Sequence, residues 1–217
     1  MTAAAMPGPE PEMTMRHLTT IVAIAALAGL VPAATQAQEA GRFSLDLRSG
    51  AVLPTADLGA SALNPGMGLG LVANLQVMPH LNLYAGWDWA RFTLEQDLGP
   101  FEDMDVTGYS FGARFFAPSL GSVTPWLRAG GVYDHIELEG DDRDDRVSAD
   151  HTLGWEAGVG AAVPLGGRWA LLPGVSYRSF SPELDEIGGK ADVRYLTIDI
   201  GISATFGGPS MAAVRHR

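Results

Sequence analysis

The stretch LTIDIGISATF (196–206) alternates between two kinds of side chain along its whole length. Its even-numbered positions, from Leu196 to Phe206, are apolar, whereas the positions between them are polar or glycine and include Asp199. Because successive side chains of a β-strand leave opposite faces of the sheet, this period of two predicts a strand with one apolar and one polar face. When such strands close into a barrel with the apolar face outward, lipid can surround them. The stretch therefore predicts a membrane-spanning β-barrel with a polar interior.

The same alternation recurs in other segments, and together they predict an all-β fold of eight strands. Most of these segments have a length close to the roughly 9–11 residues that a tilted strand needs to cross a bilayer. Short and long links alternate between them, which is typical of an antiparallel up-and-down transmembrane barrel with short periplasmic turns. The predicted strands are 42–53, 67–78, 81–92, 107–117, 124–138, 152–163, 169–179 and 194–206. The short links are 79–80, 118–123 and 164–168, and the long links are 54–66, 93–106, 139–151 and 180–193.

The face that carries Leu196 and Phe206 contains no Asp, Glu, Lys or Arg in the interior of any predicted strand. A cation on the lipid face of a barrel costs about 2–4 kcal/mol at the bilayer midplane, and the cost falls toward zero near the interfaces. Arg91, Glu137 and Arg194 share this face, but they come at strand ends beside long links, where water or headgroups are expected. We therefore expect the face to contact lipid.

Aromatic residues on the same face are sorted by height when the chain is traced up and down from a periplasmic start. Amphipathic rings favour the headgroup level, so a spanning barrel should carry two aromatic girdles. The predicted girdle at the long-loop rim contains Trp87, Trp89, Tyr109, Tyr133, Trp155 and Tyr177, and the girdle at the short-turn rim contains Phe43, Phe115, Trp169 and Phe206.

The alternate face collects ionisable residues of both signs. An eight-stranded barrel is just wide enough for its own side chains, and an unpaired charge buried there would be costly. We therefore expect Arg–carboxylate pairs to close the lumen, while glycines on this face leave room for the long Arg side chains. An ion path is the alternative, because polar residues inside a membrane often mark one. The predicted lumen charge network contains Arg42, Asp46, Arg48, Asp88, Arg114, Arg128, Asp134, Glu156, Arg178 and Asp199.

Residues 1–37 are predicted to be a cleaved signal peptide. Arg16 and His17 form a short basic region, Leu18 to Val31 is mostly apolar, and small residues precede a cut before Gln38. The apolar run is too short for a spanning helix. Residues 1–12 fit poorly before such a signal, so translation is expected to start at Met13 or Met15.

Composition narrows the remaining function classes. The 217 residues suit one domain, 38–206, after an export signal. There is no cysteine, so disulfides and thiolate metal sites are excluded. A formal net charge of −11 argues against nucleic acid binding, for which a basic patch is expected.

Four stretches carry a resemblance to a known family: NPGMGLGLVANLQVMPHLNLYAGWDW (64–89), TPWLRAGGVYDHIEL (124–138), LGWEAGVGAAVPLGGRWALLPGVSYRSF (153–180) and VRYLTIDIGISATF (193–206). With them the chain resembles the eight-stranded outer-membrane β-barrel family, the group around the OmpA membrane domain and the opacity-type surface proteins. The resemblance implies a location in the outer membrane of a Gram-negative-type cell. It also implies that Phe206, the aromatic end of the last strand, matches the signal read by the barrel-assembly machinery. The tail 207–217 is too short for the peptidoglycan-binding domain of OmpA relatives, so no cell-wall anchoring is carried over.

The long links are acidic, and carboxylate clusters suit hard cations with oxygen ligands. Mg²⁺ or Ca²⁺ could bridge such loops to the phosphates of lipopolysaccharide at a bacterial surface. GDDRDDR (140–146) lacks the ligand spacing of an EF-hand, and no other His, Asp and Glu spacing suggests a metal site. We therefore predict outer-membrane lipid and lipopolysaccharide as partners, and no cofactor or dedicated metal site.

Four function classes fit the pattern to different degrees. The favoured one is a non-enzymatic barrel with a plugged lumen and a structural or surface-interaction role. The second is a narrow ion channel. The third is a lipid-modifying enzyme, for which His135, Ser148 and His151 lie near the outer rim, but no catalytic motif surrounds them. The fourth, a soluble ligand-binding barrel, would need an apolar lumen and a polar exterior, the reverse of this parity.

Overall fold

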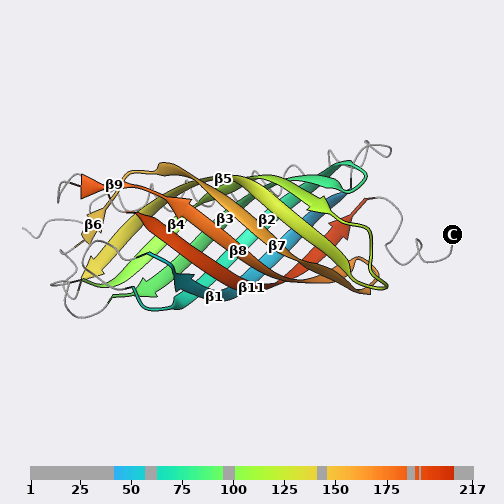
Figure 1. The fold of residues 1–217 in the computed structure, drawn as a ribbon, viewed down its shortest axis with the longest axis horizontal. Helices are drawn as coiled ribbons and strands as arrows, with labels where there is room; N and C mark the ends of the chain where they lie inside the picture. The colour runs from blue at the N-terminus through green and yellow to red at the C-terminus, as the bar shows by residue number, and fades with distance from the viewer. Residues whose placement is uncertain are drawn as a thin grey trace, which may run out of the picture. The chain divides into compact units, whose positions relative to one another are not determined.

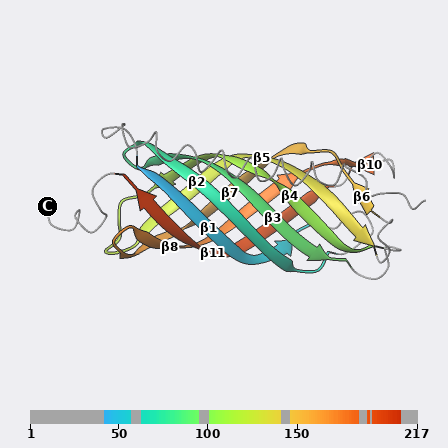
Figure 2. The same cartoon turned by 180° about the vertical axis from the view of Figure 1, so that it is seen from behind.

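Eight long strands form a closed antiparallel barrel in the computed structural model of the chain (Figures 1 and 2). The structure describes residues 42–56, 63–94, 101–140, 146–184, 189–190 and 192–207, so the predicted signal peptide and the tail from 208 onward lie outside the described residues. The strands are β1 (Phe43–Pro54), β2 (Gly66–Met78), β3 (Leu81–Thr93), β4 (Phe101–Phe116), β5 (Thr124–Gly140), β7 (Thr152–Gly166), β8 (Trp169–Phe180) and β11 (Val193–Phe206). The predicted fold class is confirmed. Within the described residues, no helix is long and apolar enough to cross a membrane.

The ring closes between the first and last strands. Hydrogen-bonded neighbours follow the order β4-β3-β2-β1-β11-β8-β7-β5, and a β4–β5 pairing completes the circle. β1 and β11 pair along their full length, from Phe43 opposite Phe206 to Pro54 opposite Tyr195. Closure gives each of the eight long strands, as far as the structure describes them, a partner on both sides, which a barrel needs if its wall is to face lipid.

Side chains alternate across this wall as predicted. Along β11 the exposed side chains of Ile198, Ile200 and Ile202 are separated by the buried Asp199 and Gly201. More than half of the Ile200 side-chain surface is exposed, at 55%, whereas Asp199 is 9% exposed. An outer surface of this kind suits a hydrocarbon environment rather than water.

The strand β4 begins earlier than the sequence predicted. We expected 93–106 to be a long link between strands, but the segment from Phe101 onward pairs with both neighbours. Met104 and Val106 alternate with Asp103 and Asp105 and are buried inside the barrel. The acidic side chains occupy the outward positions of this part of β4. The barrel wall therefore extends past the point where its outward side chains are apolar.

Two other predicted links contain short strands. β6 (Arg146–Ser148) pairs with the end of β5, and β9 (Glu183–Leu184) pairs with β10 (Gly189–Lys190). β5 itself runs to Gly140, past the predicted end at residue 138. The long-loop end of the barrel is therefore more regular than its polar composition suggested. Figure 1 shows β6 and β9 at the end opposite the short turns.

The interior is not polar throughout, contrary to the prediction. Toward the long-loop end, the inward positions are occupied by apolar residues that pack on one another. We call this cluster the apolar cap: Val52, Ala90, Phe92, Leu94, Met104, Val106, Val132, Ile136, Leu138, Ala149, Phe180, Val193 and Tyr195. A smaller cluster of Trp126, Ala162 and Leu172, with Phe116 against it, lies toward the short-turn end.

Candidate functional site

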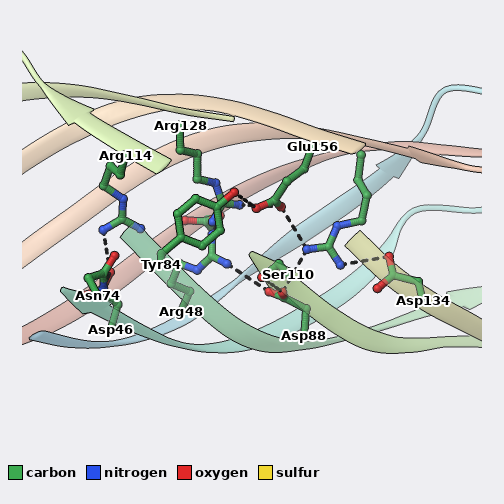
Figure 3. A network of polar contacts seen from close by, with 12 residues as sticks. Asp46, Arg48, Asn74, Tyr84, Asp88, Ser110, Arg114, Arg128, Asp134 and Glu156 are labelled. Atoms are coloured by element: carbon green, nitrogen blue, oxygen red, sulfur yellow. Dashed lines mark hydrogen bonds and ion pairs between the residues drawn. The ribbon is translucent and has the colours of Figure 1, made fainter. Parts of the chain in front are cut away.

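The guanidinium of Arg178 is the centre of a charged layer across the lumen. Figure 3 shows its three carboxylate partners, Asp88, Asp134 and Glu156. Its Nη2 donates to Asp88 Oδ2 at 2.9 Å and to Glu156 Oε2 at 3.0 Å, and its Nη1 donates to Asp134 Oδ2 at 3.3 Å. These partners come from β3, β7 and β5, and Arg178 comes from β8. The Arg178 guanidinium thus links strand β8 to three other strands.

Arg48 extends this layer from Asp88 to strands β1 and β11. Arg48 Nη2 donates to Asp88 Oδ1 at 3.0 Å, and Arg48 Nη1 lies 3.7 Å from Asp199 Oδ2. The hydroxyl of Ser110 donates to Asp88 Oδ2 at 2.7 Å. The Asp88 carboxylate therefore accepts hydrogen bonds from three strands, which is the satisfaction that a buried charge requires.

Glu156 receives a hydroxyl and a second guanidinium in addition to Arg178. Tyr84 Oη donates to Glu156 Oε1 at 2.6 Å, and Arg128 Nη2 lies 3.3 Å from Glu156 Oε2. Arg128 also lies 5.8 Å from the centre of the Tyr84 ring, within the range of a cation–π contact.

A separate pair lies closer to the short-turn end. Arg114 Nη1 donates to Asp46 Oδ2 at 2.7 Å, and Asn74 Nδ2 donates to the same oxygen at 3.0 Å. The Arg114 guanidinium lies 5.0 Å from the Trp126 ring, which belongs to the smaller apolar cluster. With Asp46, Asn74 and Arg114 included, each of the eight barrel strands contributes at least one side chain to the polar interior.

Three members of the network were missing from the sequence prediction. Asn74, Tyr84 and Ser110 all lie at inward positions of their strands, so the parity that selected the charged residues also contained the signal for these three. The prediction included only carboxylates and guanidiniums, and these three side chains are an amide, a phenol and a hydroxyl. In a lumen, neutral hydroxyls and amides complete the hydrogen bonds that charged groups leave open.

Glycines make room for these side chains. A methyl group at Gly70 would come within 2.6 Å of Asp88 Oδ1, and one at Gly201 would come within 3.0 Å of Arg48 Cγ. A methyl group at Gly130 would overlap the Tyr84 hydroxyl and the backbone of β4. The narrow lumen can hold four guanidiniums and the Tyr84 ring because glycines occupy inward positions beside them, as Gly70 and Gly201 do on either side of Arg48.

Arg42 lies apart from the network, contrary to the prediction. It precedes β1 and lines a cavity of about 500 Å³ at the short-turn end, together with Ser44, Gln76, Ser203 and other polar residues. Four residues of extended chain separate it from Asp46, roughly 13 Å, and that carboxylate is already bonded to Arg114 and Asn74. Among the described residues, none forms an ion pair or side-chain hydrogen bond with the Arg42 guanidinium.

The lumen narrows above this cavity. Within the charged layer the remaining space is about 30 Å³, bordered by Arg48, Asp88, Arg128, Arg178 and Asp199 among others. A space of this size holds only a few water molecules. The apolar cap then fills the interior toward the long-loop end.

The predicted girdle residues lie on the outer surface. Trp87, Tyr109, Tyr133, Trp155, Phe115, Trp169 and Phe206 are exposed, and Phe43, Trp89 and Tyr177 are partly exposed. Trp87, Tyr109 and Tyr133 are successive partners across β3, β4 and β5. At the other end Phe43 and Phe206 contact each other, with ring centres 6.3 Å apart.

Charged residues of the outward face are paired at the long-loop rim. Arg91 Nε donates to Asp105 Oδ1 at 2.6 Å, and Arg91 Nη1 lies 3.7 Å from Asp103 Oδ2. Arg194 Nη2 donates to Asp192 Oδ2 at 2.9 Å. All of these side chains retain contact with solvent, so their outward position does not require burial in lipid.

Two histidines meet at the same rim. His135 Nδ1 lies 3.2 Å from His151 Nε2, and His135 Nε2 lies 3.3 Å from Glu137 Oε1. The His151 ring stacks on Tyr133 with centres 4.9 Å apart. Partial desolvation of the exposed His151 ring, and then the neighbouring His135, lower the pKa of this imidazole below its ordinary value, which favours its neutral form. Within the described residues no hydrogen bond joins Ser148 to either imidazole, so the components of a nucleophile–base pair do not meet here.

Comparison with known proteins was made on sequence and on structure. A family model described as "Outer membrane protein beta-barrel domain" matches residues 23–206. No curated protein matches the sequence. In the described part of the chain, no group of three or more His, Cys, Asp or Glu side chains is arranged to hold a metal ion.

Several solved structures share the fold at low sequence identity. Neisserial surface protein A is 12% identical with a TM-score of 0.57, and the match covers 76% of this chain and 97% of that one. The outer membrane protein OprG from Pseudomonas aeruginosa is 15% identical with a TM-score of 0.54, covering 80% and 99%. A major outer membrane protein from Thermus thermophilus is 18% identical with a TM-score of 0.53, covering 77% and 100%.

Proposed function

The chain belongs to the outer membrane protein β-barrel family and lies in the outer membrane, and from that premise we propose that it is a non-enzymatic barrel with a closed lumen and a structural or surface-interaction role. The observation that carries this proposal is the network of Arg–carboxylate pairs that involves seven of the eight strands across the interior, while the eighth, β2, contributes the Asn74 amide to Asp46. Above it the apolar cap supports closure, because an apolar constriction excludes both water and ions.

Conductance through a planar bilayer tests the closed lumen. The full chain, refolded and inserted into a bilayer in symmetric KCl, should give no sustained conductance steps. A variant with Arg178→Ser and Phe92→Ala, which removes the centre of the charged layer and one large ring of the apolar cap, is the matched control. It should conduct more than the parent if these groups are the barrier. Sustained steps in the parent protein would refute closure and favour the narrow channel.

A surface role is supported by the acidic long-loop end. Asp103, Asp150 and Asp192 all lie at this rim and retain solvent exposure. The segment GDDRDDR (140–146) adds four Asp in sequence. Carboxylates of this density bind hard divalent cations through oxygen. We propose that Mg²⁺ or Ca²⁺ bridges them to the phosphates of lipopolysaccharide.

The bridging proposal predicts a Mg²⁺-dependent stability that appears only with lipopolysaccharide. The melting temperature would be measured in bilayers with and without lipopolysaccharide, each with Mg²⁺ or with EDTA. Replacing Asp141, Asp142, Asp144 and Asp145 by Asn should abolish the Mg²⁺ effect. Replacing Arg143 and Arg146 by Gln alters the same segment without removing carboxylates and should preserve it. An equal Mg²⁺ effect in phospholipid alone would argue against the bridge.

A further inference from the structure

We propose that His135 and His151 form a two-histidine site for a borderline-soft divalent metal, Zn²⁺ or Cu²⁺, at the long-loop rim. Glu137 is the positioning residue of this site. The site is distinct from the oxygen-rich loops proposed above to bind Mg²⁺ or Ca²⁺, because imidazole nitrogen selects zinc and copper, whereas carboxylates select the hard cations.

The separation of the two nitrogens carries the proposal. His135 Nδ1 and His151 Nε2 lie 3.2 Å apart. Two imidazole nitrogens bound to one tetrahedral zinc ion at 2.0–2.1 Å would be separated by about 3.3–3.4 Å. The side chains therefore already have the spacing of neighbouring ligands, and small rotations about their side-chain bonds would direct both lone pairs at one ion.

Glu137 prepares the His135 ring for this role. Its Oε1 lies 3.3 Å from His135 Nε2, so the ring can donate its N–H there and keep the lone pair on Nδ1. A carboxylate on the far nitrogen of a metal-binding histidine fixes the tautomer and makes the ring a stronger ligand. The same arrangement places the unprotonated Nδ1 of His135 toward His151 Nε2, which donates a hydrogen bond to it before an ion binds.

The second histidine is held by its surroundings. The backbone N–H of Ala149 donates to the Ile136 carbonyl at 3.0 Å, and Ala149 is buried in the apolar cap. Two residues later, His151 stacks on the Tyr133 ring of β5. Because both imidazoles are fixed before an ion arrives, less conformational entropy is lost on binding.

The site is open to solvent on its outer side. His151 is exposed, and the Glu137 side chain is 47% exposed. Since two histidines supply two ligands, the remaining positions on the metal would be taken by water or by an oxygen atom from outside. An ion bound here would join β5 to the segment preceding β7.

Titration of the full chain with ZnCl₂ by calorimetry, in detergent micelles, tests the site. His135→Gln and His151→Gln should each abolish the binding step. Glu137→Gln should weaken it by about 10–100-fold, the usual effect of removing a partner of a metal-binding histidine. His80→Gln is the matched control, because His80 is an exposed histidine in the turn between β2 and β3, and it should bind as the parent does.

A spectroscopic measurement distinguishes this site from other histidines in the chain. Electron paramagnetic resonance of the Cu²⁺-loaded parent should show two equatorial nitrogens, reduced to one in either His→Gln variant. Folding of each variant is checked by the heat-dependent shift of the barrel on gels. Unchanged zinc binding in a folded His135→Gln or His151→Gln variant overturns the site. Unchanged affinity in Glu137→Gln overturns the positioning role of that residue.

Discussion

Arg178 on β8 and Asp88 on β3 lie on opposite walls of the barrel, four strands apart in either direction round the sheet, and meet across the lumen with Nη2 2.9 Å from Oδ2. Ninety residues of sequence separate them. A contact of this kind can form only after the sheet has closed, so it couples the two halves of the wall. The charged layer therefore joins opposite walls of the barrel as well as neighbouring strands, such as β7 and β8 through Glu156 and Arg178.

Removal of Arg178 should be strongly destabilising. In Arg178→Met, Asp134 loses its only ion-pair partner among the described residues, while Asp88 and Glu156 keep other partners. Leaving one buried charge unpaired typically costs about 3–5 kcal/mol. Urea unfolding in lipid vesicles would measure this loss. The control Arg194→Met breaks the exposed pair with Asp192 and should cost about 1 kcal/mol or less. Equal losses in the two variants would contradict a structural role for the charged layer.

A charged residue placed on the outer face should show which part of the barrel wall contacts the hydrocarbon core of the membrane. Ile200 lies in the middle of β11 and faces outward. Ile200→Arg should lower the free energy of unfolding in vesicles by about 2–4 kcal/mol, because lipid does not solvate the guanidinium. Thr93→Arg adds the same side chain at the exposed end of β3, near Arg91, and should cost about 0–1 kcal/mol. If the two variants lose the same stability, Ile200 does not contact hydrocarbon.

The apolar cap should contribute to stability through packing. Phe92 is fully buried and contacts Tyr195 with ring centres 5.3 Å apart. Phe92→Ala should cost about 3–5 kcal/mol, the usual effect of removing a buried phenylalanine ring. The same change at Phe111, whose ring faces outward, should cost less because lipid fills the space. Unfolding in vesicles compares the two, and a larger loss at Phe111 would contradict a packed interior at the long-loop end.

Substitution of Phe206 should affect assembly of the barrel in the cell but not its stability in vitro. We expect the barrel-assembly machinery to read the aromatic end of the last strand, so Phe206→Ala should lower the amount of folded protein in the outer membrane. Its ring lies on the outer surface against Phe43 and the Arg168 guanidinium. Refolding in vesicles should therefore change little. Phe43→Ala removes the other ring of this contact and serves as the control. If Phe43→Ala and Phe206→Ala reduce folded protein equally in cells, Phe206 has no special role in assembly.

Local periodicity was sufficient to predict much of this structure. Leu71, Val159 and Ile200 face outward and Arg48 faces inward, because side-chain direction in a strand depends only on residue parity. Near the strand ends the same alternation continues further than the predicted strand boundaries. Asp103 and Asp105 lie in the predicted link 93–106, although Met104 and Val106 beside them continue the alternation. A charged outward position excludes lipid contact but does not exclude a strand.

The sequence by itself determined which residues line the lumen and which face outward, because that choice is made within each strand. Tertiary structure alone decided which partners meet, since strand tilt and stagger bring together residues from opposite walls. Arg42 and Arg114 are both inward cations, yet of the two only Arg114 reaches a carboxylate of the described residues. The contact between His135 and His151 likewise depends on the path of the chain between β5 and β7, which no spacing in the sequence specifies.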